Sequence, residues 1–302
     1  MILPDRVVIK EVGPRDGLQN EAGVVSTEDK IALVNRLSEA GFQYIEVTSF
    51  VHPKWIPQLS DAEAVLSGIE RRPGVQYSAL VPNERGLERA LKARVDAVNV
   101  FMSASESHNQ KNINKSIAAT YPVLEPVVRT AKAEGLPVRG YVSTVFGCPY
   151  EGDIPVQQVV EVAVRLLEMG IDELSLGDTI GVAVPSQVTE VIEALRNVIP
   201  LERMGLHFHD TRGMAVANVL AGLQAGVTVF DGSVGGLGGC PYAPGASGNV
   251  ATDDLLYLFE KMGVSTGIDS AKFNEATAWL EETLGRQLAS HARAVARTSQ
   301  GG

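Results

Sequence analysis

The sequence predicts a single (β/α)8 TIM barrel with extra helices at its C-terminal end. Apolar, strand-like segments alternate with helix-like segments in about eight units of roughly 30 residues, which suits a barrel of about 250 residues. No linker, low-complexity segment or charge block interrupts the 302 residues. Glycines also follow helix-like segments at positions where a left-handed cap is favoured: Gly41, Gly135, Gly170 and Gly226.

The first unit shows the pattern that recurs along the chain. Residues 7–12 predict a buried strand, and residues 13–20 a polar loop punctuated by Gly and Pro. A helix is then expected to 40, because Ser26 or Thr27 can cap its first turn and acidic residues follow at its positive end. The same reasoning predicts further strands at 44–48, 75–81, 97–101, 138–146, 173–176, 205–210 and 228–233, and helices at 61–68, 84–92, 117–134, 156–169, 185–198, 214–225 and 251–262.

These elements define the expected organisation of the chain. Residues 1–268 are expected to form the barrel, 269–297 a C-terminal helical extension and 298–302 a disordered tail. The segment 105–115 is polar, and we expect it to be a solvated loop.

Composition narrows the class of protein. The formal net charge of -10 argues against nucleic-acid or anionic-membrane partners, which need a basic surface. No apolar run reaches the roughly 18 residues of a membrane span, and the first residues lack an export signal, so a cytoplasmic location is expected. The two cysteines, Cys148 and Cys240, form no Cys-x-x-Cys pair and indicate neither a disulfide framework nor a thiolate zinc site.

The most informative stretch is Gly-Leu-His-Phe-His-Asp at residues 205–210. Side chains alternate along a strand, so His207 and His209 share one face, roughly 6–7 Å apart at Cα. Taken alone, the pair has two interpretations: two ligands that converge on one cation, or core histidines that each hydrogen-bond to a backbone carbonyl.

The predicted barrel gives this pair partners. Active sites of such barrels lie at the C-terminal ends of the strands. Asp16 leaves the first strand, which neighbours the eighth, so its carboxylate can reach the histidine pair. Imidazole and oxygen ligands in an open site suit Mg²⁺ or Mn²⁺, although Zn²⁺ or Fe²⁺ could compete.

The loop at 235–249 is the most glycine-dense of the chain. It has three interpretations: a phosphate cradle, a flexible surface loop with an incidental cysteine, or a lid that carries Cys240 over the metal. A thiol has a pKa of about 8.5, so it is mostly protonated near neutrality and suited to donate a proton to a carbanion. Cys148 lacks such glycines and is interpreted as structural. Lys111, Lys115 and, more weakly, Lys54 are candidate phosphate contacts.

Six stretches together resemble the 3-hydroxy-3-methylglutaryl-CoA lyase family, whose wider group of metal-dependent barrels includes isopropylmalate and homocitrate synthases. They are Glu-Val-Gly-Pro-Arg-Asp-Gly-Leu-Gln-Asn-Glu at 11–21, Val-Thr-Ser-Phe at 47–50, Gly-Tyr-Val-Ser at 140–143, Ser-Leu-Gly-Asp-Thr-Ile-Gly at 175–181, His-Phe-His-Asp-Thr at 207–211, and the glycine loop at 236–249. The cysteine-bearing glycine loop resembles the lyases rather than the synthases, and so favours cleavage over condensation.

The resemblance implies an activity: cleavage of 3-hydroxy-3-methylglutaryl-CoA to acetoacetate and acetyl-CoA, as in leucine catabolism. It implies Mg²⁺ or Mn²⁺ bound by Asp16, His207, His209 and Asn249, with Arg15 on the thioester carbonyl and Cys240 as the catalytic thiol. His207 or Asp16 would be the base. The remaining implied roles are substrate contacts from Gln19, Ser49, Ser175 and Thr179, and support of the site by Glu46 and Asp178. The implied partner is a small acyl-CoA, and we expect a homodimer or a higher homo-oligomer.

Two departures from the better-known animal lyases affect the expected substrate. Arg212 stands where an aromatic residue is usual, and the segment 102–110 diverges. Both can alter the selection of the acyl chain or of CoA. A sibling lyase for a longer-branched 3-hydroxyglutaryl-CoA is therefore the nearest alternative, followed by a condensing synthase and by a non-catalytic protein that binds metal or CoA.

Overall fold

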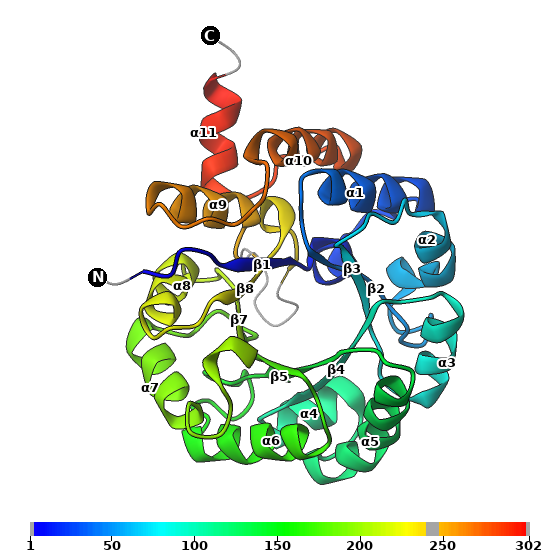
Figure 1. The fold of residues 1–302 in the computed structure, drawn as a ribbon, viewed down its shortest axis with the longest axis vertical. Coiled ribbons are helices and arrows are strands. Elements are labelled where there is room, and N and C mark those ends of the chain that lie inside the picture. Colours follow the sequence, from blue (N-terminus) through cyan, green and yellow to red (C-terminus); the bar gives the residue numbers. More distant parts are fainter. Residues whose placement is uncertain (1–2, 240–247, 300–302) are drawn as a thin grey trace.

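A computed structural model describes residues 3–239 and 248–299 of the chain. Its strands form one closed, parallel barrel in chain order from β1 to β8. The last strand pairs with the first, so the loops that follow β1, β7 and β8 are neighbours in space. Helices surround the strands as an outer ring (Figure 1). The predicted (β/α)8 barrel is confirmed.

The element bounds lie close to the expected ones. The strands are β1 Val8–Glu11, β2 Tyr44–Ser49, β3 Gln76–Leu80, β4 Ala97–Ser103, β5 Val138–Ser143, β6 Glu173–Asp178, β7 Met204–Phe208 and β8 Val229–Gly232. The α-helices are α1 Thr27–Glu39, α2 Ala62–Gly68, α3 Glu84–Lys92, α4 Glu106–Ile113, α5 Ile117–Ala133, α6 Val156–Glu168, α7 Pro185–Leu195, α8 Ala215–Gln224, α9 Thr252–Lys261, α10 Ser270–Leu284 and α11 His291–Ser299.

Local chemistry explains the helix ends. The Ser26 hydroxyl accepts a hydrogen bond from the backbone N–H of Asp29 at 3.0 Å, which caps α1 as expected. The four glycines expected at helix ends all have positive φ: +97° at Gly41, +74° at Gly135, +99° at Gly170 and +97° at Gly226.

Two segments differ from expectation. The supposed loop at 105–115 contains α4, because the Ser105 hydroxyl accepts from the His108 backbone at 3.1 Å and the Asn109 side chain is buried against Thr120. Its polar composition concealed a short, half-exposed helix. At the other end, α11 includes Thr298 and Ser299, which were expected to lie in a disordered tail. Arg293 and Arg297 anchor this helix by pairing with Glu281 of α10.

The lumen of the barrel is polar beneath the site. Interiors of such barrels are usually filled by branched apolar side chains. Here Arg139 from β5 pairs with Asp231 from β8 at 2.7 Å, and Lys10 from β1 pairs with Glu173 from β6 at 2.8 Å. A Cβ on Gly205 would lie 2.6 Å from the Arg139 guanidinium, so glycine is needed there for the arginine to cross the lumen.

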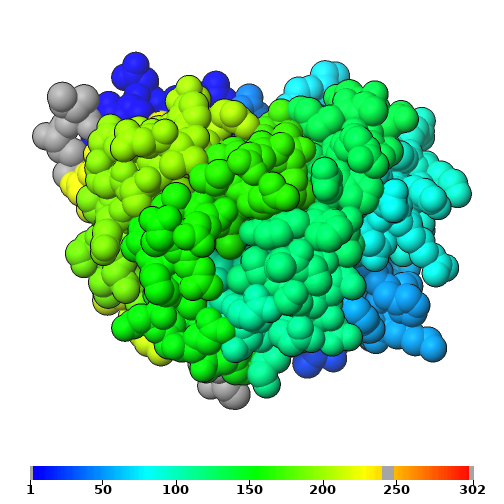
Figure 2. All heavy atoms as spheres, turned by 90° about the horizontal axis from the view of Figure 1, so that it is seen from below, coloured from blue at the N-terminus to red at the C-terminus, as the bar shows by residue number. Residues whose placement is uncertain are grey.

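The C-terminal helices lie on one side of the ring, and α11 projects outward from it (Figure 1). Helix α10 packs against α1 and α9, and the rings of Phe42 and Phe273 lie 5.6 Å apart at their centroids. The opposite wall is covered by side chains from the middle of the chain, coloured green in Figure 2. Among the described helices, none combines the length and the apolar character needed to cross a bilayer.

Candidate active site

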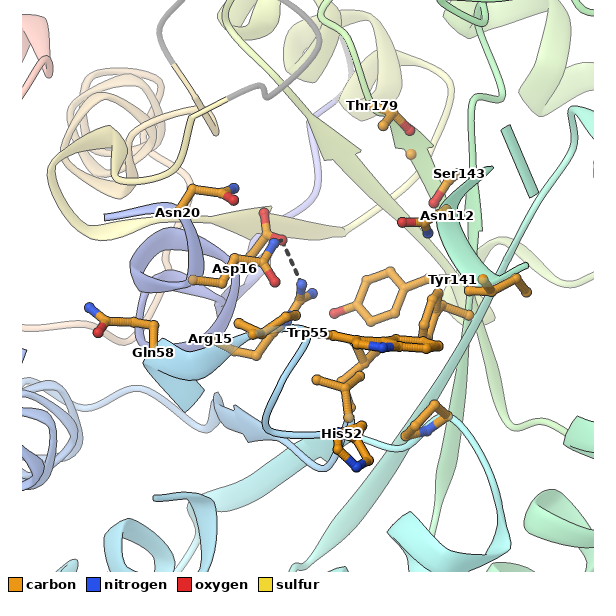
Figure 3. A pocket seen from close by; sticks show the side chains of 18 of the residues that line it. Arg15, Asp16, Asn20, His52, Trp55, Gln58, Asn112, Tyr141, Ser143 and Thr179 are labelled. Atoms are coloured by element: carbon orange, nitrogen blue, oxygen red, sulfur yellow. Dashed lines mark hydrogen bonds and ion pairs between the residues drawn. The ribbon is translucent and has the colours of Figure 1, made fainter. Parts of the chain in front are cut away.

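A cavity of about 1170 Å³ opens at the C-terminal ends of the strands. It is lined by loop residues after β1, β2 and β6, and by strand residues of β5 and β7. In Figure 3, Arg15 and Asp16 lie on one side of this cavity, with Tyr141 and Thr179 across from them and Trp55 and His52 toward one end. The cavity thus lies at the face of the barrel where the site is predicted.

Asp16, His207 and His209 converge at the floor of this cavity. The two Nε2 atoms lie 3.9 and 4.0 Å from Asp16 Oδ2, and one ligand atom from each residue falls within 4.8 Å of the others. His207 belongs to β7, whereas His209 lies just beyond its last residue and pairs with Asn249 through an isolated antiparallel bridge. This arrangement brings together three of the four ligands implied by the family resemblance.

Asn249 completes the set. Its amide nitrogen donates to Asp16 Oδ2 at 2.8 Å and to the Leu237 carbonyl at 3.1 Å. Its amide oxygen is buried and has no hydrogen-bond partner among the described residues. A buried acceptor without a donor is costly unless something electropositive occupies the space beside it. The oxygen and nitrogen donors present therefore fit a divalent cation.

The charge states suit such a cation. Burial opposes ionisation of Asp16, but Arg15 and the two histidines outweigh it and hold its pKa well below the usual range. Burial, with His207 beside it, lowers the pKa of His209 to about 4, so this imidazole is neutral near pH 7. A neutral imidazole and a carboxylate are the forms that bind metals.

His207 differs from its neighbour because a carboxylate lies behind it. Its Nδ1 is 3.1 Å from Oδ2 of Asp231, a buried residue of β8. Burial disfavours the charged imidazole, but the hydrogen bond and charge of Asp231 outweigh burial and raise the pKa of His207. Arg139 in turn overcomes the effect of burial on Asp231 and lowers its pKa to about 2.

Arg15 is held in place by two carboxylates. The backbone turns tightly at Gly13–Gly17, directly after β1, and places Arg15 Nη1 2.5 Å from Asp16 Oδ1. Its Nη2 donates to Glu46 Oε2 at 2.9 Å, and the Tyr141 hydroxyl donates to the same oxygen at 3.2 Å. Glu46 is fully buried and also accepts from Asn99, and its role in supporting the site stays a prediction.

The other predicted residues lie at different depths. Gln19 and Thr179 both line the cavity. The Gln19 amide donates to Asp16 Oδ1 at 2.8 Å, and the Thr179 hydroxyl accepts from the Thr144 backbone N–H at 2.8 Å. Ser49 is buried and accepts from the Val51 backbone at 3.3 Å, while Ser175 donates to Asp231 at 3.4 Å. Neither serine is among the residues that line the cavity.

Asp178 supports the loop after β6. Its two carboxylate oxygens accept from the backbone N–H groups of Val182 and Ala183 at 2.9 and 3.1 Å. Burial raises its pKa to about 6. Its contacts hold the loop after β6, and its role in supporting the site stays a prediction.

Cys240 lies outside the described residues. The described ends of its loop adjoin the site: Gly239 lines the cavity and its carbonyl accepts from Asn20 at 3.2 Å. Cys148 is buried with its sulfur 2.9 Å from the Ser105 hydroxyl, in agreement with a structural role. Of the three candidate lysines, Lys54 and Lys115 line the cavity, whereas Lys111 lies over the Tyr150 ring at 4.6 Å.

Three residues of the site were absent from the sequence-based prediction: Asp231, Arg139 and Tyr141. Asp231 and Arg139 are charged residues inside strands. Asp231 lies in Val-Phe-Asp-Gly at 229–232, and Arg139 lies in Val-Arg-Gly-Tyr at 138–141. A charged residue within a buried strand needs a partner, which is the signal that could have identified them. Tyr141 lies in one of the quoted motifs, but nothing local indicates its partners.

Comparison with known proteins agrees with this geometry. The HMGL-like family model matches residues 6–279. Hydroxymethylglutaryl-CoA lyase YngG of Bacillus subtilis is 56% identical over 299 residues, which cover 99% of this chain and all of the relative. A Pseudomonas aeruginosa protein named 3-hydroxy-3-isohexenylglutaryl-CoA/hydroxy-methylglutaryl-CoA lyase is 50% identical, with 97% of each chain covered.

A solved structure shares the whole fold. The crystal structure of the Bacillus subtilis HMG-CoA lyase superposes with a TM-score of 0.97 at 56% sequence identity, covering 98% of this chain and 100% of that chain. Sequence, fold and the cluster of Asp16, His207 and His209 lead to one assignment: the chain belongs to the HMGL-like family.

Proposed function

We propose that this protein is a divalent-metal-dependent lyase that cleaves 3-hydroxy-3-methylglutaryl-CoA to acetoacetate and acetyl-CoA. The observation that carries the proposal is the placement of a carboxylate–imidazole cluster and a buried arginine at one cavity. The high identity to relatives named as hydroxymethylglutaryl-CoA lyases supports the same reaction.

Asp16, His207, His209 and Asn249 would hold the cation. When bound, a divalent cation lowers the pKa of a hydroxyl group that it coordinates. Mg²⁺ or Mn²⁺ fits the oxygen-containing ligand set.

Different residues of the chain would serve as base, as oxyanion contact and as proton donor. A base accepts the proton of the tertiary hydroxyl, and the bond between C3 and C2 breaks. Its electron pair passes into the thioester, C3 becomes the keto carbon of acetoacetate, and an acetyl-CoA enolate remains. Arg15, oriented by Asp16 and Glu46, stabilises the enolate oxygen. The Cys240 thiol protonates the C2 carbon and completes acetyl-CoA.

The base remains one of the two residues predicted, Asp16 or His207. The depressed pKa of Asp16 makes its carboxylate a weak base. His207 has Nδ1 against Asp231, so only its Nε2 is directed toward Asp16 and the cavity. Metal binding and proton transfer would compete for that one atom.

The CoA portion would leave the cavity past Trp55, Lys54 and Lys115. Trp55 is 68% exposed although it lines the cavity, and an exposed indole offers a stacking surface for a base. The two lysines supply positive charge for phosphates on a chain whose net charge is -10.

A second substrate is favoured by one observation. The wall of the cavity includes the apolar side chains of Leu80, Phe101, Val123, Leu124 and Val142. They offer a surface for a longer 3-alkyl branch, such as the isohexenyl group in the name of the Pseudomonas aeruginosa relative. A condensing synthase of the same group is the less favoured alternative.

One assay tests both substrates. The purified protein is incubated with Mg²⁺ and either 3-hydroxy-3-methylglutaryl-CoA or its isohexenyl analogue, with and without a chelator. Acetoacetate that appears from the first substrate and disappears with the chelator is the expected result. Turnover of the analogue alone would transfer the assignment to the sibling lyase. Turnover of neither substrate would contradict the proposal.

Two further proposals concern the whole protein. We expect a homodimer or a higher homo-oligomer, which light scattering during size-exclusion chromatography measures directly. A cytoplasmic location also stays a prediction, tested by fractionating cells that express the chain.

A further inference from the structure

We propose that Asp231 is a positioning residue that sets the orientation and the tautomer of His207, so that Nε2 presents a lone pair to the cation. This inference rests on the proposed metal site. Asp231 and its partners lie beneath the site, in the polar lumen of the barrel.

The two ring nitrogens of His207 have different surroundings. Nδ1 lies 3.1 Å from Asp231 Oδ2, and Nε2 lies 3.9 Å from Asp16 Oδ2. An ionised carboxylate has no proton to donate, so His207 must donate from Nδ1. In the neutral imidazole, the lone pair is then on Nε2, the atom on the side of the metal cluster. His209 differs, because its Nδ1 is buried without a hydrogen-bond partner among the described residues.

Asp231 can orient the ring because it is itself held from both sides. Its Oδ1 accepts from Arg139 Nη2 at 2.7 Å, and its Oδ2 accepts from the Ser175 hydroxyl at 3.4 Å as well as from His207. The side chains of Arg139 and Asp231 are 2% and 1% exposed. Arg139 also donates to the Tyr141 hydroxyl at 2.8 Å, so the guanidinium cannot rotate freely.

The arginine makes one substitution particularly informative. Arg139 can only donate, so in the Asp231→Asn variant the amide oxygen must face Arg139 and the amide nitrogen must face His207. His207 Nδ1 would then have to accept a hydrogen bond. The proton would move to Nε2, where it blocks metal binding, although the volume of the side chain has not changed.

The test is a calorimetric titration of Mn²⁺ into wild type and Asp231→Asn. Loss of the carboxylate behind a metal-binding histidine typically weakens metal affinity about 10–100-fold, and we expect a loss in this range at unchanged stoichiometry. Asp61→Asn is the matched control: Asp61 pairs with the buried Lys30 at 2.9 Å, and neither residue lines the cavity. Its Mn²⁺ affinity should equal that of wild type.

The outcomes separate this inference from the proposed function. Wild-type Mn²⁺ affinity in Asp231→Asn would refute the role of Asp231 while leaving the metal site intact. No Mn²⁺ binding by wild type would refute the metal site itself. A second measurement needs neither metal nor a change at Asp231: ¹⁵N spectra of histidine-labelled wild type at pH 9, with His207 assigned by its loss in His207→Gln. A proton on Nδ1 supports the inference, and a proton on Nε2 overturns it.

Discussion

At the scale of single residues, Asp16 connects the two charged parts of the site. Its Oδ1 accepts from Arg15 at 2.5 Å and from Gln19 at 2.8 Å, while its Oδ2 accepts from Asn249 and faces both histidines. One carboxylate therefore orients the arginine that would meet a developing oxyanion and also contributes to the cation cluster. Any change at Asp16 alters both functions, so it cannot separate them.

The two cysteines offer a cleaner comparison at this scale. We expect Cys240→Ala to lower kcat by about 10²–10⁴-fold, the usual contribution of a positioned proton donor, with Mn²⁺ affinity unchanged. Cys148→Ala is the control, because Cys148 is buried against Ser105 and makes no contact with the metal cluster. Acetoacetate formation and Mn²⁺ titration check both variants. Full activity of Cys240→Ala would show that Cys240 has no catalytic role.

At the scale of elements, Glu11 at the end of β1 joins two loops of the site. Its Oε1 accepts from the backbone N–H of Gly13, in the turn that carries Arg15, and from that of Val234, where the glycine loop begins. Its Oε2 accepts from the Thr252 hydroxyl at the start of α9. Leu288, between α10 and α11, packs against Gly235, where φ is +62° and a Cβ would meet its side chain at 2.2 Å. The C-terminal segment thus helps to hold the base of the glycine loop.

Glu11 should also make stability depend on pH. Burial raises its pKa to about 8, against about 4.3 in an unfolded chain. Because the pKa of Glu11 is raised in the folded state, protonated Glu11 stabilises the folded protein. This contribution is complete below about pH 4.3 and is lost as pH rises through 8. The Glu11→Gln variant cannot ionise, so its melting temperature should fall less between pH 5 and pH 8 than that of wild type.

Thermal melts of the metal-free proteins across this range give the comparison. Glu63→Gln serves as the control, because Glu63 pairs with Arg89 at the surface and should leave the wild-type decline unchanged. Parallel curves for wild type and Glu11→Gln would show that Glu11 is already ionised in the folded protein.

At the scale of the whole molecule, barrel closure is what assembles the site. Asp16 follows β1, His207 lies in β7, and Asn249 follows β8, yet Asp16 meets both of the others because β8 pairs with β1 and with β7. A cation bound by these residues would therefore link the first strand of the barrel to its last two strands. Metal binding should therefore stabilise the entire fold, since a ligand that binds only the folded state shifts the folding equilibrium.

We expect Mn²⁺ at about 100 times its Kd to stabilise wild type by about 2.7 kcal/mol and to raise its melting temperature accordingly. His209→Ala should lose most of this shift, because it removes one ligand. His291→Ala is the control: its side chain is 85% exposed, contacts Asp254 on α9 and is not among the residues that line the cavity. Differential scanning calorimetry with and without Mn²⁺ distinguishes them, and an undiminished shift in His209→Ala would exclude it as a ligand.

Local properties of the sequence determined the fold class, the order of its elements and the face on which the site lies. The cap at Ser26, the glycines that end helices and the alternation of apolar segments act within a few residues, so they can be recognised without the rest of the chain. The polar character of 105–115 gave a wrong prediction for the same reason, since Ser103 and Thr120, which hydrogen-bond to the buried Asn109 side chain, lie outside that segment. Asp16 and the His-x-His pair were recognisable as candidates because each follows or ends a strand.

Only the tertiary structure decided how those candidates are held. Nothing near Asp231 in sequence predicts that its carboxylate meets Arg139, 92 positions away, or His207 on the adjacent strand. The placement of Ser175 beneath the histidine rather than on the cavity wall, and of Glu11 between two loops, likewise depends on which strands become neighbours. Hydrogen bonds and ion pairs in a barrel lumen are set by closure of the whole sheet, and that closure brings together residues that are remote along the chain.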